Sequence, residues 1–158
     1  MHPQFLKVIN SKFKFSLFLL KNLPSAYFSG VRVVQATAEE CSVTVPYKWF
    51  SRNPFGSTYF ACLAMAAEMS TGVLALGNIY KRQPKVSMLV VNLQAEYYKK
   101  ATGITTFVCA DGQLFATTIA TCIAQLTSQT VTATAIGYNA TKEVVAKFVI
   151  TWSFKAKA

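Results

Sequence analysis

The chain carries one long apolar segment that holds a single charged residue. From Ser57 to about Leu76 the sequence has no proline and is rich in alanine. Glu68 is the only charged residue between Arg52 and Lys81. Such a segment predicts a helix that is apolar or small on nearly every face, because it lacks the polar stripe of a surface helix. A helix of this kind must be enclosed by other elements.

Six segments around that helix are predicted to be strands. The first and last pairs alternate strongly and are rich in β-branched and aromatic residues, with short polar turns between them. A Thr- and Ala-rich stretch, residues 112–126, predicts a second, shorter helix. Runs of strands with one helix too apolar for water predict an α+β fold, in which an antiparallel six-stranded sheet wraps around the long helix. The six segments are residues 30–37, 40–47, 86–101, 104–111, 130–139 and 143–155.

The N-terminal residues predict one amphipathic helix over residues 4–22, which ends before Pro24. The run FSLFLL after basic residues is similar to a secretory signal, but lysines on both sides leave an apolar core too short for one. We therefore expect an N-terminal helical extension over residues 1–23 and a single domain over residues 24–158. The apolar stripe of the extension is expected to contain Phe5, Val8, Ile9, Phe13, Leu17 and Leu20.

The composition narrows the possible partners and the cellular location. A net charge of +10 favours a nucleic-acid partner, yet the 16 Lys and Arg residues are scattered and form no basic helix face. No segment has the length and purity expected of a membrane span. The four cysteines lack CxxC spacing, which indicates buried reduced thiols. We expect a cytoplasmic protein with no nucleic-acid or membrane partner, and its 53% hydrophobic content predicts surface covered by another subunit.

Several chemistries lack the residues that they require. The only histidine is His2, so Ser-His-Asp and Cys-His catalysis have no base and histidine metal sites have no ligands. No GxxxxGK[ST] or GxGxxG phosphate loop occurs either. Carboxylates are the remaining candidates for acid-base catalysis. Five of the six lie in predicted turns or on a strand, namely Glu39, Glu40, Glu96, Asp111 and Glu143.

Glu68 differs from the other five acids because it lies in mid-helix among Ala and Met residues. Burial there would raise its pKa toward the range useful for a general base. The alternative is that Glu68 marks a solvated helix face. The first turn of the same helix presents unpaired N–H groups, which suit an oxyanion developing on a carbonyl. A carboxylate two turns further on indicates acyl transfer or thioester hydrolysis.

This pattern resembles the hotdog-fold thioesterases, especially the branch that contains the phenylacetate-pathway and 4-hydroxybenzoyl-CoA enzymes and its bacterial relatives. The resemblance covers residues 24–155. That family has an Asn, a Gly three residues later, often a His followed by two Gly, and an acid two helical turns on. The segment EYYKKATG, residues 96–103, is also similar to a strand end of the family. In this chain the corresponding positions hold Asn53, Gly56, Tyr59, Phe60, Ala61 and Glu68.

The resemblance implies a role for each of these positions. Glu68 would be the general base or nucleophile, the Phe60 N–H would bind the oxyanion, and Asn53 would position the ligand beside Gly56 and Tyr59. The substrate would be an acyl-CoA or acyl-carrier thioester, with no metal and no cofactor apart from the coenzyme A of the substrate. A homodimer or homotetramer would build each site from two subunits. The candidate cations for the coenzyme A phosphates are Lys81, Arg82, Lys85, Lys99 and Lys100.

A second hypothesis comes from the positions that depart from the family pattern. Phe60 puts a ring where glycine lets a thioester approach, and Tyr59 cannot titrate as histidine does. The chain would then be a non-catalytic hotdog module that binds acyl-CoA or acyl chains, or that only dimerises, with Phe60 as a core aromatic. An open apolar tunnel to Glu68 favours the enzyme, whereas a cleft filled by Tyr59 and Phe60 favours the module.

Overall fold

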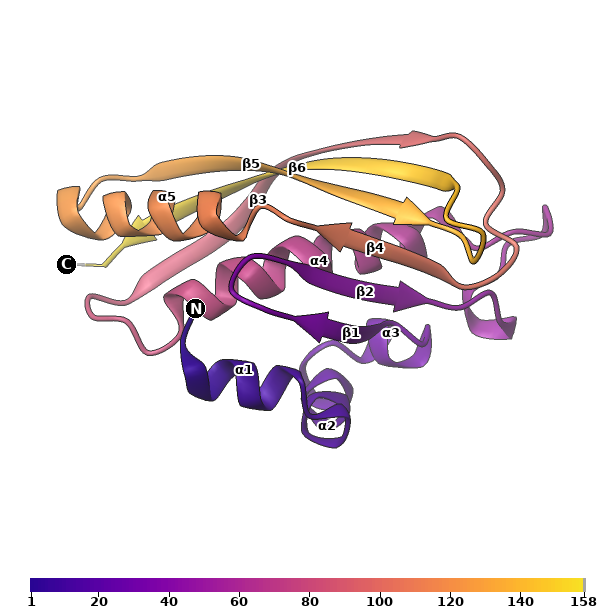
Figure 1. Ribbon diagram of the computed structural model, residues 1–158, viewed down its shortest axis with the longest axis horizontal. Coiled ribbons are helices and arrows are strands. Elements are labelled where there is room, and N and C mark those ends of the chain that lie inside the picture. Colours follow the sequence, from indigo (N-terminus) through magenta and orange to yellow (C-terminus); the bar gives the residue numbers. More distant parts are fainter. Residues whose placement is uncertain (158) are drawn as a thin grey trace.

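The computed structural model describes residues 1–157. Figure 1 shows a twisted sheet that curves over one long helix, with the N-terminal helices below them. The helices are α1 (Pro3–Ile9), α2 (Lys12–Asn22), α3 (Pro24–Phe28), α4 (Phe60–Ile79) and α5 (Gly112–Gln125), with a 3-10 turn, η1, at Trp49–Ser51. The strands are β1 (Arg32–Ala36), β2 (Cys41–Val45), β3 (Val86–Tyr97), β4 (Thr105–Cys109), β5 (Gln129–Tyr138) and β6 (Val144–Ala156).

The sheet has the strand order β1-β2-β4-β5-β6-β3, and every pairing is antiparallel. The longest ladder joins β3 to β6, and it leaves β3 at one edge of the sheet. Both the α+β class and the sheet wrapped around one central helix are confirmed. The predicted second helix is α5, which begins at Gly112 as expected.

The central helix α4 is held against the sheet by close packing and by one buried hydrogen bond. Trp152 of β6 donates its indole N–H to the Thr71 hydroxyl at 3.0 Å. A Cβ atom on Gly72 would lie 3.4 Å from the same indole ring, so the glycine lets the ring approach the helix closely. Aromatic residues of the sheet, among them Phe107 and Phe148, are fully buried over this helix. The predicted enclosure of the apolar helix is therefore confirmed.

The expectation that no segment is long and apolar enough to span a membrane is wrong for α4. By length and composition it is the one helix within residues 1–157 that could cross a membrane. One charged residue among twenty does not lower the mean hydropathy of the helix enough to exclude a membrane span. Most of the helix is nevertheless buried inside the fold, and a core helix passes the same compositional test.

The N-terminal segment also differs from its prediction. It forms two helices instead of one, because α1 ends at Ile9 and α2 begins at Lys12. Asn10 causes the break: its side-chain amide donates to the Ala36 carbonyl oxygen at 3.0 Å and accepts from the Ala36 N–H at 3.1 Å. The asparagine thereby provides hydrogen-bond partners for both backbone groups of Ala36, the last residue of β1. A contact across 26 residues cannot be read from helical periodicity.

The break changes which apolar residues of this segment are buried. Phe5 and Ile9 of α1 join the core of the sheet, together with Phe15 and Leu19 of α2. The predicted stripe is therefore correct for Phe5 and Ile9 of α1, and wrong for Val8 and for its members on α2. Its members Val8, Phe13, Leu17 and Leu20 are exposed. The boundary proposed between residues 23 and 24 stays a prediction.

Helix α5 lies where β4 and β5 separate, since these strands pair only through residues 106–108 and 136–138. Asp111 precedes the helix and accepts the Thr134 N–H of β5 at 2.7 Å. Gly112 follows at the turn between β1 and β2, where its N–H donates to the Glu39 carbonyl oxygen at 2.9 Å. The four cysteines are buried and free, as the sequence predicts.

Candidate active site

A tight turn before α4 is built by the Asn and Gly of the predicted motif. The Asn53 side-chain oxygen accepts the N–H groups of Phe55 at 3.0 Å and Ser57 at 3.2 Å, and its amide donates to the Ser57 hydroxyl at 3.1 Å. Gly56 has φ +73°, a left-handed conformation that favours glycine. In this structure both residues shape the turn, and the polar atoms of Asn53 are engaged within it.

The helix begins at Phe60, three residues later than predicted, because Ser57 and Thr58 do not cap it. The Thr58 N–H and hydroxyl both donate to the Ala101 carbonyl oxygen, at 2.8 Å and 3.1 Å. The start of α4 is thereby tied to the loop after β3. Among residues 1–157, the N–H groups of Phe60 and Ala61 donate no hydrogen bond. Free donors at a helix start suit a developing negative charge.

A cleft of about 800 Å³ opens at this helix start. Tyr59 is 45% exposed and Phe60 is 57% exposed, so the interpretation of Phe60 as a core aromatic is wrong. The two rings pack edge to face at 4.8 Å and line one wall, which leaves the cleft open beside them. Tyr97 and Tyr98 also line the cleft, although the sequence motif gave neither of them a role. The two adjacent tyrosines in the segment EYYKKATG were the sequence signal that could have identified them as cleft residues.

The five predicted phosphate-binding cations lie at two ends of α4. Lys99 and Lys100 line the cleft, where Lys100 donates to the Phe55 carbonyl oxygen at 3.2 Å. Lys99 is hydrogen-bonded to Glu143. This bond, with those from Asn139 and Thr141, lowers the pKa of Glu143 to about 2. The other three line a separate hollow beyond the C-terminal end of α4, and they are Lys81, Arg82 and Lys85.

Glu68 lies half-buried on α4, facing the joint between α2 and α3. A hollow of about 270 Å³ at this joint is lined by Glu68, Met65, Met69 and residues 22–26. A Cβ atom on Gly72 would lie 3.3 Å from the Glu68 carboxylate, so the glycine leaves room for it. Burial raises the pKa of Glu68 above its ordinary value.

The Glu68 carboxylate has neither a cation nor a hydrogen-bond donor to stabilise it within the described residues. The situation of three other acids is different: Asp111 accepts the Thr134 N–H, Glu96 accepts the Tyr98 hydroxyl, and Glu143 accepts from Lys99. A half-buried carboxylate without partners is costly for the fold, since burial disfavours its charged form. This arrangement is typical of a group kept for chemistry.

A single protomer does not bring Glu68 and the free donors together. Eight residues separate Glu68 from Phe60, which is about 12 Å along a helix at 1.5 Å per residue. A general base works within about 3 Å of the proton that it takes. Glu68 does not line the cleft at the helix start. An apolar tunnel from the cleft to this carboxylate, which would have favoured the enzyme, is therefore not formed within the described part of one protomer.

Two surfaces of the protomer remain uncovered, one on β3 and one on α4. The edge strand β3 exposes apolar side chains on both faces. On α4, partly exposed residues recur at spacings of three and four, which places them on one helix face with Glu68 near its middle. The exposed residues of β3 are Leu89, Val91, Leu93 and Tyr97. The partly exposed residues on this face of α4 are Ala61, Ala64, Met65, Glu68, Gly72 and Leu76.

Solved structures share this architecture over nearly the whole chain. A protein of unknown function from Chlorobaculum tepidum superposes with a TM-score of 0.79 at 15% identity, covering 98% of this chain and 99% of its own. A Pseudomonas aeruginosa protein of unknown function, named "Probable Thioesterase", gives 0.77 at 16% identity, with 92% and 96% covered. A thioesterase from Haemophilus influenzae gives 0.65 at 8% identity, with 92% and 91% covered. No curated protein matches the sequence.

The antiparallel sheet, the enclosed helix and these superpositions define a protein with the hotdog fold. The family model for the domain of unknown function DUF4442 matches residues 12–154. The chain belongs to the DUF4442 family.

Proposed function

We propose that the protein hydrolyses an acyl thioester, with the acyl group carried by coenzyme A or by a carrier protein. The observation that carries this proposal is Glu68, a half-buried carboxylate without partners on an uncovered face of α4. Support comes from the free N–H groups at the start of the same helix and from the open cleft beside them. The hotdog fold is shared with solved proteins named as thioesterases.

The proposed reaction uses the two groups in separate roles. Glu68 accepts a proton from a water molecule as the water oxygen attacks the thioester carbonyl carbon. The resulting oxyanion accepts hydrogen bonds from the N–H groups of Phe60 and Ala61. Collapse of this intermediate breaks the carbon–sulfur bond, and the leaving sulfur takes the proton held by Glu68, so the acid and the thiol leave as products and Glu68 is again ionised. The acyl chain would occupy the apolar part of the cleft along Leu63 and Tyr97.

We propose that the active unit is a homodimer formed through β3 and the uncovered face of α4. A long apolar edge strand exposes unpaired backbone groups and invites pairing with another copy. Residue 64 is midway between Phe60 and Glu68. A two-fold axis near Ala64, with antiparallel α4 helices, therefore sets Glu68 of one copy opposite Phe60 of the other. The small side chain of Ala64 permits a close approach there.

We expect Leu93→Lys to weaken this dimer at least tenfold, because it places a charge in the apolar contact. Analytical ultracentrifugation across a concentration series measures the change. The matched control is Leu126→Lys, which adds the same charge at an exposed leucine after α5. An unchanged association constant for Leu93→Lys would remove β3 from the interface.

The pH dependence of hydrolysis tests the role of Glu68. A general base acts in its deprotonated form, so the rate rises with pH as Glu68 loses its proton. Burial raises the pKa of Glu68 above the ordinary 4.5, which moves this rise to higher pH than for an exposed glutamate. We expect a plot of kcat/KM against pH to show this rise in the wild type. A midpoint at or below the ordinary value would contradict the proposal.

A non-catalytic acyl-binding module is the second candidate. The Phe60 ring favours it, because the ring lies at the helix start where a thioester carbonyl must approach the free donors. Isothermal titration calorimetry with an acyl-CoA, run beside an assay for released thiol, separates the two candidates. Saturable binding without thiol release by the wild type would identify the module.

A further inference from the structure

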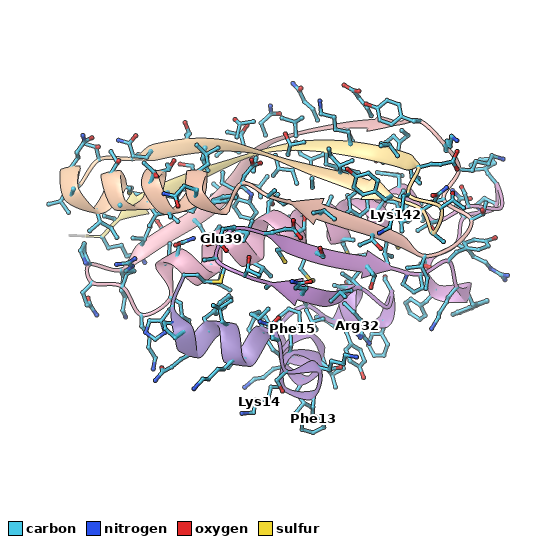
Figure 2. All side chains as sticks on the ribbon, in the orientation of Figure 1. Phe13, Lys14, Phe15, Arg32, Glu39 and Lys142 are labelled. Atoms are coloured by element: carbon cyan, nitrogen blue, oxygen red, sulfur yellow. The ribbon has the colours of Figure 1, made fainter. Side chains whose placement is uncertain are left out.

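The helix α2 is apolar on two opposite faces. Phe15 and Leu19 point into the core, where both are buried. The outer face presents Phe13, Leu17 and Leu20, which are 75%, 52% and 41% exposed. These three residues, here called the α2 ridge, are spaced by four and then three positions, so they lie in one row along the helix. Figure 2 shows Phe13 pointing away from the molecule and Phe15 pointing toward its body.

Lysines border the α2 ridge. At 100° per residue, Lys14 and Lys21 fall on one side of the row and Lys12 falls on the other. All three are exposed, and none forms an ion pair within residues 1–157. The sequence contains no acid before Glu39. An apolar row between unpaired cations characterises helices that lie in the plane of a membrane surface.

The position of α2 leaves this surface accessible. Figure 1 shows α2 at the border of the molecule opposite β5 and β6. Apolar surface continues from the ridge toward α1 through an apolar hollow of about 380 Å³, lined in part by Val8 and Phe18. Lys7 of α1 adds a further exposed cation. The surface is separate from β3 and from the cleft at the start of α4.

We propose that α2 docks the protein on an anionic phospholipid bilayer, with the α2 ridge inserted between acyl chains and the bordering lysines on headgroup phosphates. This differs from the absence of a membrane partner expected from composition. A second copy of the chain is a poorer occupant, because it would oppose like charges without acids to pair them. The lipid surface supplies both the apolar medium and the negative charge that this helix face requires.

Vesicle flotation tests the proposal with the full chain. The wild type is expected to float with phosphatidylcholine vesicles that contain phosphatidylglycerol, and to float less with pure phosphatidylcholine or at high salt. Replacing Phe13, Leu17 and Leu20 by Ser should lower the partition coefficient at least tenfold. Replacing Lys12, Lys14 and Lys21 by Gln should lower it by about a hundredfold.

Matched variants control for charge and hydrophobicity. Lys85, Lys155 and Lys157 are exposed near one end of β3 and β6, and their change to Gln removes the same charge while leaving flotation intact. Serine at Ile104, Leu114 and Leu126 removes three exposed apolar residues elsewhere, with the same expectation. The circular dichroism spectrum of every variant should match the wild type, since none of the replaced side chains is buried.

Three outcomes would overturn the proposal. The first is a wild type that stays at the bottom of the gradient with anionic vesicles. The second is equal flotation of the wild type and the serine variant of the α2 ridge, which leaves only nonspecific charge attraction. The third is a smaller oligomer for that serine variant without a change in flotation, which assigns the ridge to contacts between copies. The assay does not measure hydrolysis, so it is independent of the proposed thioesterase activity.

Discussion

Replacing Glu68 with Gln is expected to lower kcat for thioester hydrolysis by about a hundredfold or more, the effect of losing a positioned general base. Glutamine keeps the shape of the side chain but cannot accept the proton from the attacking water. Release of free thiol from a panel of acyl-CoAs of different chain lengths measures the rates. The control is Glu39→Gln, which removes the same charge from the exposed turn between β1 and β2 (Figure 2).

Stability separates a catalytic Glu68 from a structural one. Its pKa is raised in the folded protein, so its favourable contribution to stability is complete below about 4.5 and is lost as pH rises through the folded-state pKa. Glu68→Gln should therefore unfold at higher urea than the wild type near neutral pH, and this advantage should vanish in acid. Equal hydrolysis rates would remove Glu68 from the mechanism, whatever the stability result.

Gly112→Ala is expected to destabilise the fold by at least about 2 kcal/mol, as overpacking against rigid atoms does. The added Cβ would lie 2.1 Å from the Ala38 carbonyl oxygen and 2.6 Å from the Glu39 Cα, and both are backbone atoms. The start of α5 and the turn between β1 and β2 must then separate. Thermal and urea unfolding measure the loss.

Gly103→Ala is the matched control for this change. No atom lies within 4 Å of a Cβ built on Gly103, so the same added methyl group meets open space. Its stability should equal that of the wild type or rise slightly, because alanine restricts the unfolded chain. Equal stability of the Gly112→Ala and wild-type proteins would show that the turn between β1 and β2 can move away from α5.

The sequence was sufficient to predict the architecture because its strongest signal, the apolar segment around Glu68, has one economical solution. The exact ends of the helices could not be predicted, because they depend on contacts between residues that are distant in the sequence. The start of α4 moved from Ser57 to Phe60 because Thr58 is bound by Ala101, 43 residues away. The N-terminal helix was broken for the same kind of reason, since Asn10 binds the end of β1. Periodicity contains no information about such partners.

The candidate site was only partly predictable. Glu68 was identifiable because no other charged residue between Arg52 and Lys81 supplies a solvated stripe for it. The separation of Lys81 from Lys99 could not be predicted from the sequence, because it depends on which end of α4 each loop reaches. The turn-building role of Asn53 was also hidden, since the motif resemblance implied a ligand contact instead. In each case the missing information was three-dimensional placement.

The joint between α2 and α3 makes the acidity of Glu68 adjustable from outside the helix that carries it. Residues 22–26 supply part of the wall around its carboxylate. Widening that wall, for instance through Leu23→Ala, admits solvent and moves the proton affinity toward that of free glutamate. The strength of Glu68 as a base can thus be tuned by substitutions that leave every α4 position unaltered.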